Sequence, residues 1–171
     1  MALPKKLKHM NLFNDGNNYV GQCGSVTLPK LGRKLEAWRG GGMDGSVKAD
    51  LGHSDDGIQM EWTLGGLDVT VLRQFGAVKA DGVLLRWAGS YQRDDTGDTS
   101  AVEVVVRGRH EEMDMGEAKP GEGTENKITT ACSYYKLTVD GNVEIEIDLL
   151  NFVFNVNGTD MLAAHRKNIG L

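Results

Sequence analysis

Few side chains in this sequence stand together in a pattern that does chemistry. His110, Glu111 and Glu112 are consecutive, and a carboxylate beside an imidazole can orient it for proton transfer. Successive side chains of a strand point to opposite faces, so His110 and Glu111 would face apart if this segment is extended. We therefore expect no acid–base pair at this position.

Candidate cation sites fail on their spacing. Asp94, Asp98 and Glu103 take positions 1, 5 and 10 of a possible calcium loop, but an EF-hand needs Gly at position 6 and Glu at position 12. Thr99 and Val105 stand there instead. The histidines have no spacing that pairs them with one another or with cysteine as a zinc motif. They are His9, His53, His110 and His165.

Residues 40–46 (GGGMDGS) begin like a phosphate-binding loop, which needs Lys and then Ser or Thr after its second glycine. Ser46 and Val47 follow Gly45, so we interpret the segment as a flexible connection. Cys23 and Cys132 are predicted to be small core residues in a reducing compartment. The sequence thus predicts a protein that is not an enzyme and uses no metal or cofactor.

The elements that position these residues are predicted to be mainly strands. Apolar and polar residues alternate with period two in four segments, and a Thr-, Tyr- and Val-rich fifth ends at the hairpin signal Asp140-Gly141. The predicted strands cover residues 58–64, 83–91, 102–107, 128–139 and 143–148. A helix is predicted from Leu67 to Gly76, and another over about 158–169, capped by Asn157 or Thr159.

These elements predict one mainly β domain over residues 1–171. Its two packed antiparallel sheets would form a barrel or sandwich with one or two flanking α-helices. Apolar residues make up 40% of the 171 and charged residues 25%, as in a soluble globular protein. No apolar run approaches the roughly 20 residues of a membrane span, so no membrane insertion is expected.

The formal net charge of -5 is unevenly distributed. Residues 1–39 carry seven basic and two acidic side chains, whereas residues 40–171 carry 12 basic and 22 acidic ones. A basic arm over about 1–15 on an acidic body suggests contact between subunits or with a negatively charged partner. Plain surface scatter is the alternative.

Residues 143–148 alternate Val, Ile and Ile with three carboxylates, Glu144, Glu146 and Asp148. Carboxylates in line on one strand repel one another within a Debye length of about 8 Å. They would form a solvated outer face, or else a wall that faces a water-filled channel or an anion that must not bind.

Read in order, eight segments resemble the major tail tube proteins of contractile-tailed, P2-like bacteriophages, which are related to the tube proteins of R-type pyocins. The likeness runs over essentially the whole chain. The segments are 11–19 (NLFNDGNNY), 28–39 (LPKLGRKLEAWR), 40–45 (GGGMDG), 89–97 (GSYQRDDTG), 106–110 (VRGRH), 134–141 (YYKLTVDG), 145–151 (IEIDLLN) and 156–171 (VNGTDMLAAHRKNIGL).

The resemblance implies a subunit with two packed β-sheets and a flanking helix. Six subunits would form a ring, and rings would stack into a hollow tube inside a contractile sheath. The tube would lie in the virion tail, after assembly in the cytoplasm of the bacterial host. Its partners would be further copies, the tail sheath protein, the baseplate and tail terminator proteins, and double-stranded DNA that passes without specific binding.

The resemblance also implies roles for particular residues. A loop over about 39–60 would reach the next ring, and the carboxylates of Glu144, Glu146 and Asp148 would face the lumen. Contacts between rings or subunits are expected at Lys5, Lys6, Lys8, Arg39, Gly40, Gly41, Gly42, Met43 and Asp44.

Three other functions stay open on the sequence. The chain could form the tube of a pyocin-like particle, or that of a type VI secretion system, which moves effector proteins. A small β-barrel that binds a ligand in its mouth, as a binding module or an enzyme, is the alternative from a different class.

Overall fold

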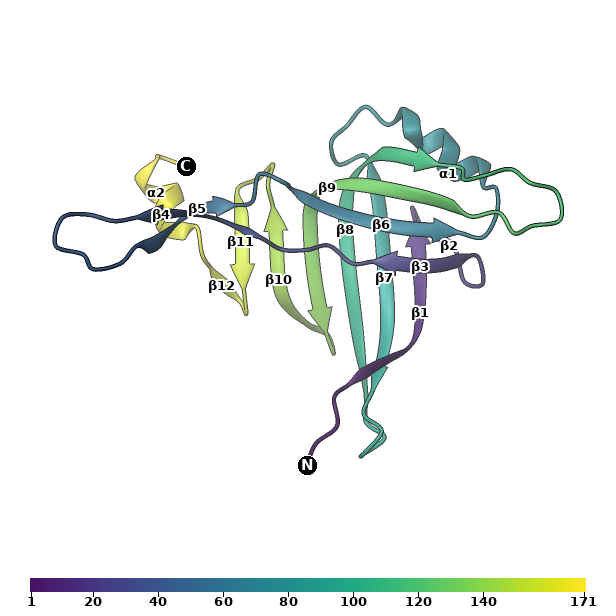
Figure 1. The fold of residues 1–171 in the computed structure, drawn as a ribbon, viewed down its shortest axis with the longest axis horizontal. Coiled ribbons are helices and arrows are strands. Elements are labelled where there is room, and N and C mark those ends of the chain that lie inside the picture. The colour runs from purple at the N-terminus through teal and green to yellow at the C-terminus, as the bar shows by residue number, and fades with distance from the viewer.

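The chain folds around one long, bent β-hairpin. Strands β8 (Thr99–Asp114) and β9 (Asn126–Val139) pair along nearly their whole length in the computed structural model, which describes residues 1–171 (Figure 1). The outer edge of β8 pairs with β7 (Val83–Gln92), and β7 pairs with β1 (Lys6–Asn14). All of these pairings are antiparallel.

The other edge of β9 is shared between two strands. Its second half pairs with β10 (Asn142–Asp148), and its first half pairs with β6 (Ile58–Leu64). Beyond β10 lie β11 (Val153–Val156) and β12 (Thr159–Asp160), and beyond β6 lies β3 (Cys23–Thr27). The two-residue strand β2 (Asn17–Asn18) closes a tight hairpin with the end of β1.

This sharing bends the sheet into two layers at the middle of the β8–β9 hairpin. The pairing register shifts between Arg107 and Gly108, where the bend begins. A Cβ atom at Gly108 would lie 2.0 Å from the carbonyl oxygen of Ala131, so only glycine fits this close approach. The lower layer contains β1, β7 and β10–β12, and the upper layer contains β3 and β6.

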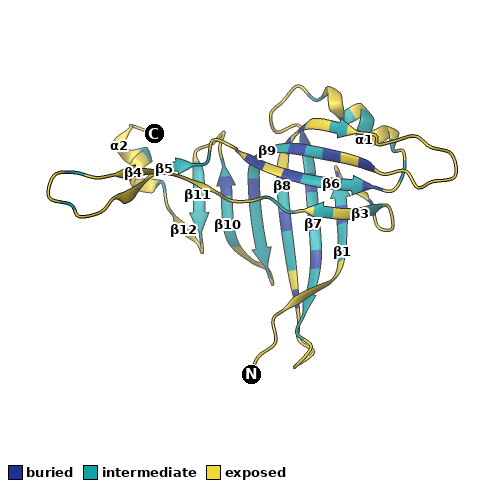
Figure 2. Cartoon of the chain, viewed as in Figure 1, coloured by how far each residue is buried: buried dark blue, intermediate teal, exposed yellow.

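The core lies between the layers, and Figure 2 shows buried residues along the strands of both layers. Trp62 of β6 and Trp87 of β7 are both fully buried, together with Leu12 of β1. Burial of each such side chain contributes roughly 1.5–3 kcal/mol, which makes this apolar set the main source of stability. The alternation that predicted β6 and β7 is therefore the alternation between core and solvent.

The strand predictions are confirmed at all five positions, and the mainly β fold with two packed antiparallel layers is confirmed. Strand β8 is much longer than the predicted segment 102–107. The basic segment 1–15, expected as an arm, contains β1, which is an integral strand of the lower layer.

The two helices are short. Helix α1 (Val69–Arg73) begins where Asp68 accepts hydrogen bonds from the backbone of Thr70 and Val71, and it continues into the 3-10 turn η1 (Gln74–Gly76). Helix α2 (Ala163–Asn168) is shorter than the expected 158–169. Neither is long and apolar enough to cross a membrane.

The start of α2 corrects the sequence prediction. Thr159 lies in β12, and Asn157 has a φ of +49° in the turn before it, so neither caps the helix. Leu162 is at the N-cap and offers no side-chain oxygen. The Asp160 carboxylate instead accepts the Leu162 N–H at 3.0 Å and pairs with Arg166.

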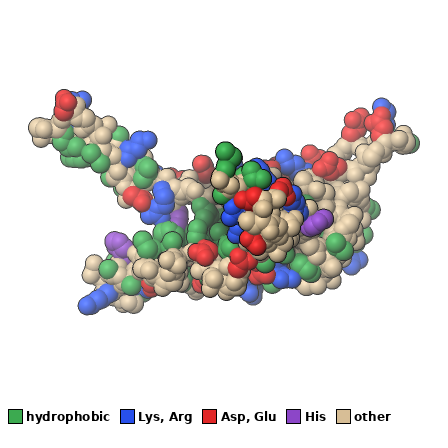
Figure 3. All heavy atoms as spheres, turned by 90° about the horizontal axis from the view of Figure 1, so that it is seen from below, with side chains coloured by type: hydrophobic (Ala, Val, Ile, Leu, Met, Phe, Trp, Pro, Cys, Tyr) green, Lys and Arg blue, Asp and Glu red, His purple; other side chains and the backbone are tan.

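A separate two-stranded sheet projects from the body. Strands β4 (Arg33–Trp38) and β5 (Val47–His53) pair only with each other and extend to the left in Figure 1. The loop of residues 115–125, which follows β8, projects at the opposite end of the molecule (Figure 3). We call residues 33–53 the projecting hairpin.

Candidate assembly surfaces

Hydrogen bonds within the turn hold the tip of the projecting hairpin in one conformation. The Arg39 guanidinium donates hydrogen bonds to the backbone oxygens of Met43 at 3.2 Å and Asp44 at 3.1 Å. The Gly40 N–H donates to the sulfur of Met43 at 3.2 Å, and Gly42 adopts a φ of +83°, which favours glycine. These residues, expected at the contact between rings, therefore gather at one exposed end.

The bounds of this feature differ from the expected loop over about 39–60. The projecting hairpin begins at Arg33 and ends at His53. Residues 58–60 belong to the core strand β6, where Ile58 and Met60 are buried.

Several large apolar side chains of the projecting hairpin are exposed to solvent. Trp38 and Val47 lie opposite each other next to the tip and are 67% and 61% exposed. Leu35 and Leu51 are also exposed. Exposed apolar side chains grouped on one projection are typical of a protein–protein contact.

The root of the projecting hairpin is held on β11. The Phe154 ring lies 4.8 Å from the His53 ring, and the Arg33 guanidinium lies 5.3 Å from its centre. Arg33 also pairs with Asp50 at 3.0 Å. Burial and the nearby guanidinium lower the pKa of His53, so a neutral imidazole packs on Phe154 here.

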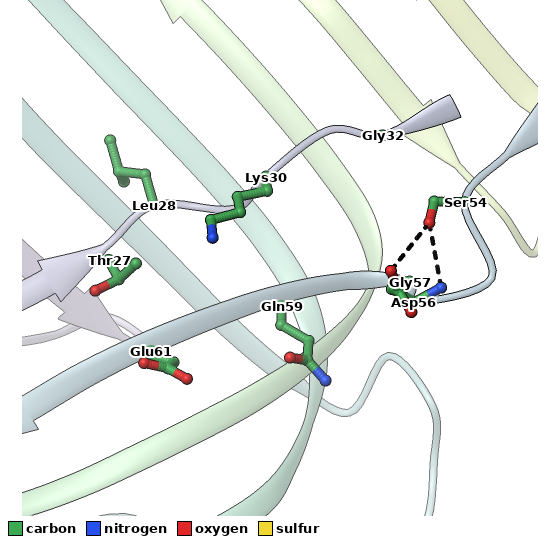
Figure 4. A pocket seen from close by; sticks show the side chains of 9 residues that line it. All are labelled: Thr27, Leu28, Lys30, Gly32, Ser54, Asp56, Gly57, Gln59 and Glu61. Atoms are coloured by element: carbon green, nitrogen blue, oxygen red, sulfur yellow. Dashed lines mark hydrogen bonds between the residues drawn. The ribbon is translucent and has the colours of Figure 1, made fainter. Parts of the chain in front are cut away.

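A polar groove lies beside the two segments that connect the projecting hairpin to the body (Figure 4). It has a volume of about 280 Å³ and forms where the chain leaves β3 and diverges from β6. Ser54 contacts both the carboxylate and the backbone N–H of Asp56 within it. Leu28 is its only hydrophobic residue, so it lacks the apolar lining of a small-molecule site.

The N-terminal lysines are used within the chain more than expected. Lys8 pairs with Asp94 at 2.8 Å, and the Lys5 ammonium donates to the Ser100 hydroxyl at 2.5 Å. Both partners belong to the turn and strand that follow β7. Lys6 is exposed and makes no such contact.

The three carboxylates expected in line on β10 do not form a regular row. The register of β10 against β9 shifts between Val143 and Ile145, so Val143 lies opposite Thr138 and Ile145 lies opposite Leu137. Val143 therefore shares a face with Glu146 rather than with Ile145, and Glu144 lies within the bulge. The expected alternation holds only from Ile145 to Asp148.

Glu146 and Asp148 stand on the face of the lower layer that points away from the core, which we call the outer sheet face. Glu146 lies opposite Lys136 and accepts a hydrogen bond from the Tyr134 hydroxyl at 3.3 Å. Asp148 accepts the backbone N–H groups of Leu150 and Asn151, each at 3.1 Å. Asp148 thus also shapes the turn that follows β10.

The outer sheet face carries cations that the sequence prediction did not include. The register places Arg86, Glu103, Arg107 and Lys136 on it, beside Glu146 and Asp148. The alternation of residues 83–92 and 102–107 contained this signal, because their polar positions must share the face opposite the core.

Of the three residues considered for acid–base chemistry, only His110 is part of the core, and Glu111 and Glu112 are exposed. His110 is buried between Thr130 and Gln74, and burial lowers its pKa to about 4. Burial raises the pKa of the Cys132 thiol to about 12, so the reactive thiolate is disfavoured. No group of three or more His, Cys, Asp or Glu residues converges as a metal site.

Comparison with known proteins decides the family. A family model described as phage tail tube protein FII matches residues 4–170. The chain belongs to the phage tail tube protein FII family. Membership assigns it a structural role in the tube of a phage tail.

Individual tail tube proteins align over most of their length. The chain is 56% identical over 172 residues to the tail tube protein of Escherichia phage P2, with full coverage of both chains. It is 40% identical to the major tail tube protein of Serratia phage KSP20, covering 94% of this chain and 92% of that protein. A chain of the cryo-electron microscopy structure of the anti-feeding prophage baseplate shares the fold, with a TM-score of 0.51, 10% identity, and coverage of 81% and 97%.

Proposed function

We propose that six copies of this chain form a ring, and that rings stack into the hollow tail tube through which DNA leaves the virion. The 56% identity to the tail tube protein of phage P2 over the full length is the observation that carries this proposal. The geometry of the chain supplies a surface for each kind of contact.

Ring closure would use the two ends of the lower layer. One end is β1, whose outer edge is paired with β2 only at Phe13 and Asn14, and the other end is β11 with β12. Free strand edges are prone to aggregation in a monomer. Joining the β1 edge of one subunit to the β11–β12 edge of the next would remove both edges and extend the lower layer around a bore.

Stacking would use the projecting hairpin. It reaches beyond the body and presents Trp38 and Val47 beside the tip formed by Arg39–Asp44. A head-to-tail contact of this kind repeats without closing, which generates a filament from rings. Lys6 would add an ionic contact between subunits, whereas Lys5 and Lys8 are occupied within their own chain.

The outer sheet face would line the bore, with Glu146 and Asp148 facing the passing DNA and Glu144 in the adjacent bulge. The opposite surface, with α1, would face a contractile sheath. The sheath, baseplate and tail terminator proteins would be further partners, and the tube would be assembled in the cytoplasm of the bacterial host. We assign the chain no catalytic step and no cofactor.

Sedimentation and negative-stain microscopy of concentrated protein test this proposal. The wild-type chain should form hollow rods or stacked rings. Trp38→Ala should remain folded, because Trp38 is exposed, but it should yield separate rings or monomers. Phe75→Ala, which removes an exposed aromatic side chain from η1, is the matched control and should form normal rods. A wild-type chain that stays monomeric at every concentration would contradict the proposal.

A further inference from the structure

Three cations stand in the middle of the outer sheet face, which also carries carboxylates. They are Arg86 of β7, Arg107 of β8 and Lys136 of β9. A purely acidic bore was the expectation from residues 143–148. The structure shows instead a face on which positive and negative side chains alternate across neighbouring strands.

Arg86 is the most closely held of the three. Its guanidinium lies 2.8 Å from the carboxylate of Glu103 on one side and 4.2 Å from the centre of the Phe13 ring on the other. These partners come from β8 and β1, the two strands that flank β7. The guanidinium therefore connects three strands. Phe13 contacts it on one side, and Glu103 balances its charge on the other.

The other two cations have acidic neighbours from the same register. Lys136 lies directly opposite Glu146. Arg107 lines a polar hollow of about 260 Å³ that also contains Asp81 and Asp148. Of the three cations, only Arg86 forms an ion pair, whereas Lys136 and Arg107 have carboxylates opposite them or across the hollow.

Local compensation matters for a surface that DNA passes. Each cation that contacts a phosphate releases a counterion from DNA, so the affinity grows steeply with the number of free cations. A ring of six subunits repeats each side chain six times, and stacked rings repeat it along the whole bore. An uncompensated Arg86 would therefore become a continuous binding site for the phosphate backbone.

We propose that Glu103 cancels the charge of Arg86 so that the bore does not retain double-stranded DNA. Arg86 packs against Phe13 and connects β7 with β1 and β8. Glu103 neutralises this cation on a surface that must not hold the phosphates of the DNA backbone. This inference rests on the proposed function, in which the outer sheet face lines the tube. It assigns to the Arg86–Glu103 pair a role that the family membership does not.

Assembled tubes with single and double substitutions test the inference. Tubes are incubated at low ionic strength with a fluorescent DNA duplex shorter than the tube, pelleted, and assayed for DNA in the pellet. Glu103→Gln should retain about tenfold more DNA than wild type, and physiological salt should reverse this. The pair is half exposed, so its loss costs little stability and the variant should assemble.

Two matched variants separate this role from a general change of charge. Glu117→Gln makes the same change in the loop of residues 115–125, away from the outer sheet face, and should bind no more DNA than wild type. Arg86→Gln/Glu103→Gln removes the cation as well and should return to the wild-type level. Equal retention by Glu103→Gln and Glu117→Gln, or retention by the double variant, would overturn the inference.

The two proposals fail in different ways. If wild-type tubes form and Glu103→Gln takes up no extra DNA, the role of Glu103 is wrong and the tube function stands. If DNA bound by Glu103→Gln appears outside the tube wall in cryo-electron micrographs, the outer sheet face does not line the bore, and both assignments of that face fall.

Discussion

The imidazole Nδ1 of His110 lies 2.9 Å from the hydroxyl oxygen of Thr130 in the core. The Trp62 indole N–H donates to the same hydroxyl oxygen, and the Gln74 amide oxygen lies 3.1 Å from His110 Nε2. Burial favours a neutral imidazole, and the contacts fit one in which Nδ1 accepts from Thr130 and Nε2–H donates to Gln74. This network ties η1 to the upper layer.

Because of His110, the free energy of unfolding should decrease as the pH decreases. Burial lowers its pKa from 6.5 to about 4 in the folded chain, so the unfolded chain binds a proton first as the pH falls. The contribution is complete above about pH 6.5 and is lost as the pH falls towards 4, by on the order of 3 kcal/mol. Urea unfolding of wild type between about pH 7.5 and 4.5 measures it.

His110→Gln is the comparison for that experiment. The variant loses the titrating group, so its free energy of unfolding should depend less on pH over this range. The advantage of wild type over the variant should therefore shrink as the pH falls. An advantage that stays constant from pH 7.5 to pH 4.5 would contradict the assignment of a neutral, buried His110.

Gly108→Ala should prevent the bend between the two layers. The new Cβ would meet the Ala131 carbonyl oxygen at 2.0 Å, and backbone cannot yield there as a flexible side chain would. We expect a loss of roughly 2–3 kcal/mol or no folded protein. Gly123→Ala is the control, because its Cβ meets nothing within 4 Å. Thermal unfolding compares them, and equal stability would show that the bend does not depend on Gly108.

Phe154→Leu should loosen the root of the projecting hairpin while keeping an apolar side chain on β11. It removes the ring that contacts Arg33 and His53, interactions of this type being worth about 0.5–1.5 kcal/mol. Hydrogen exchange should quicken several-fold across residues 33–53 and remain unchanged in β7. Phe75→Leu should leave both regions unaffected. Unchanged exchange in Phe154→Leu would mean that the ring does not hold the hairpin.

Substitutions of the N-terminal lysines should have different effects, with Lys6 affecting assembly and Lys8 affecting stability. Reversing Lys5, Lys6 and Lys8 together would also remove two contacts within the chain, so single substitutions are needed. The structure predicts that Lys6→Glu alone impairs rod formation without changing the melting temperature. Lys8→Glu should cost up to about 1 kcal/mol of stability, because it loses the exposed pair with Asp94. Normal rods from Lys6→Glu in negative stain would remove Lys6 from the interface.

Strands with one face in the core and one in solvent could be predicted from the sequence. Strands without this division could not be predicted. β6 alternates buried and polar residues from Ile58 to Leu64, so its pattern is unambiguous. β4 is exposed at every residue, so no alternation marks it. β1 has a register shift between Leu7 and His9, which breaks its period. The pattern of residues within one strand does not show where its pairing register with the next strand shifts.

The candidate surfaces divide in the same way. The glycine-rich segment around Gly40 could be predicted as a connection from its unusual, contiguous residue types, whereas its assignment to a contact between rings came from the family resemblance. The Arg86–Glu103 pair was missed because it depends on the register of β7 against β8, across 17 positions of sequence. The bulge at Val143 likewise depends on how β10 meets β9. Pairing between strands, rather than the pattern within each one, determines the composition of the outer sheet face.

Cryo-electron microscopy of the assembled wild-type protein tests the central claim most directly. We predict a hollow tube of six-subunit rings, with Glu146 and the Arg86–Glu103 pair on the bore and Trp38 buried against the next ring. A tube with α1 on the bore and the outer sheet face outside would contradict the assignment of that face. A protein that forms no tube would contradict the proposed function itself.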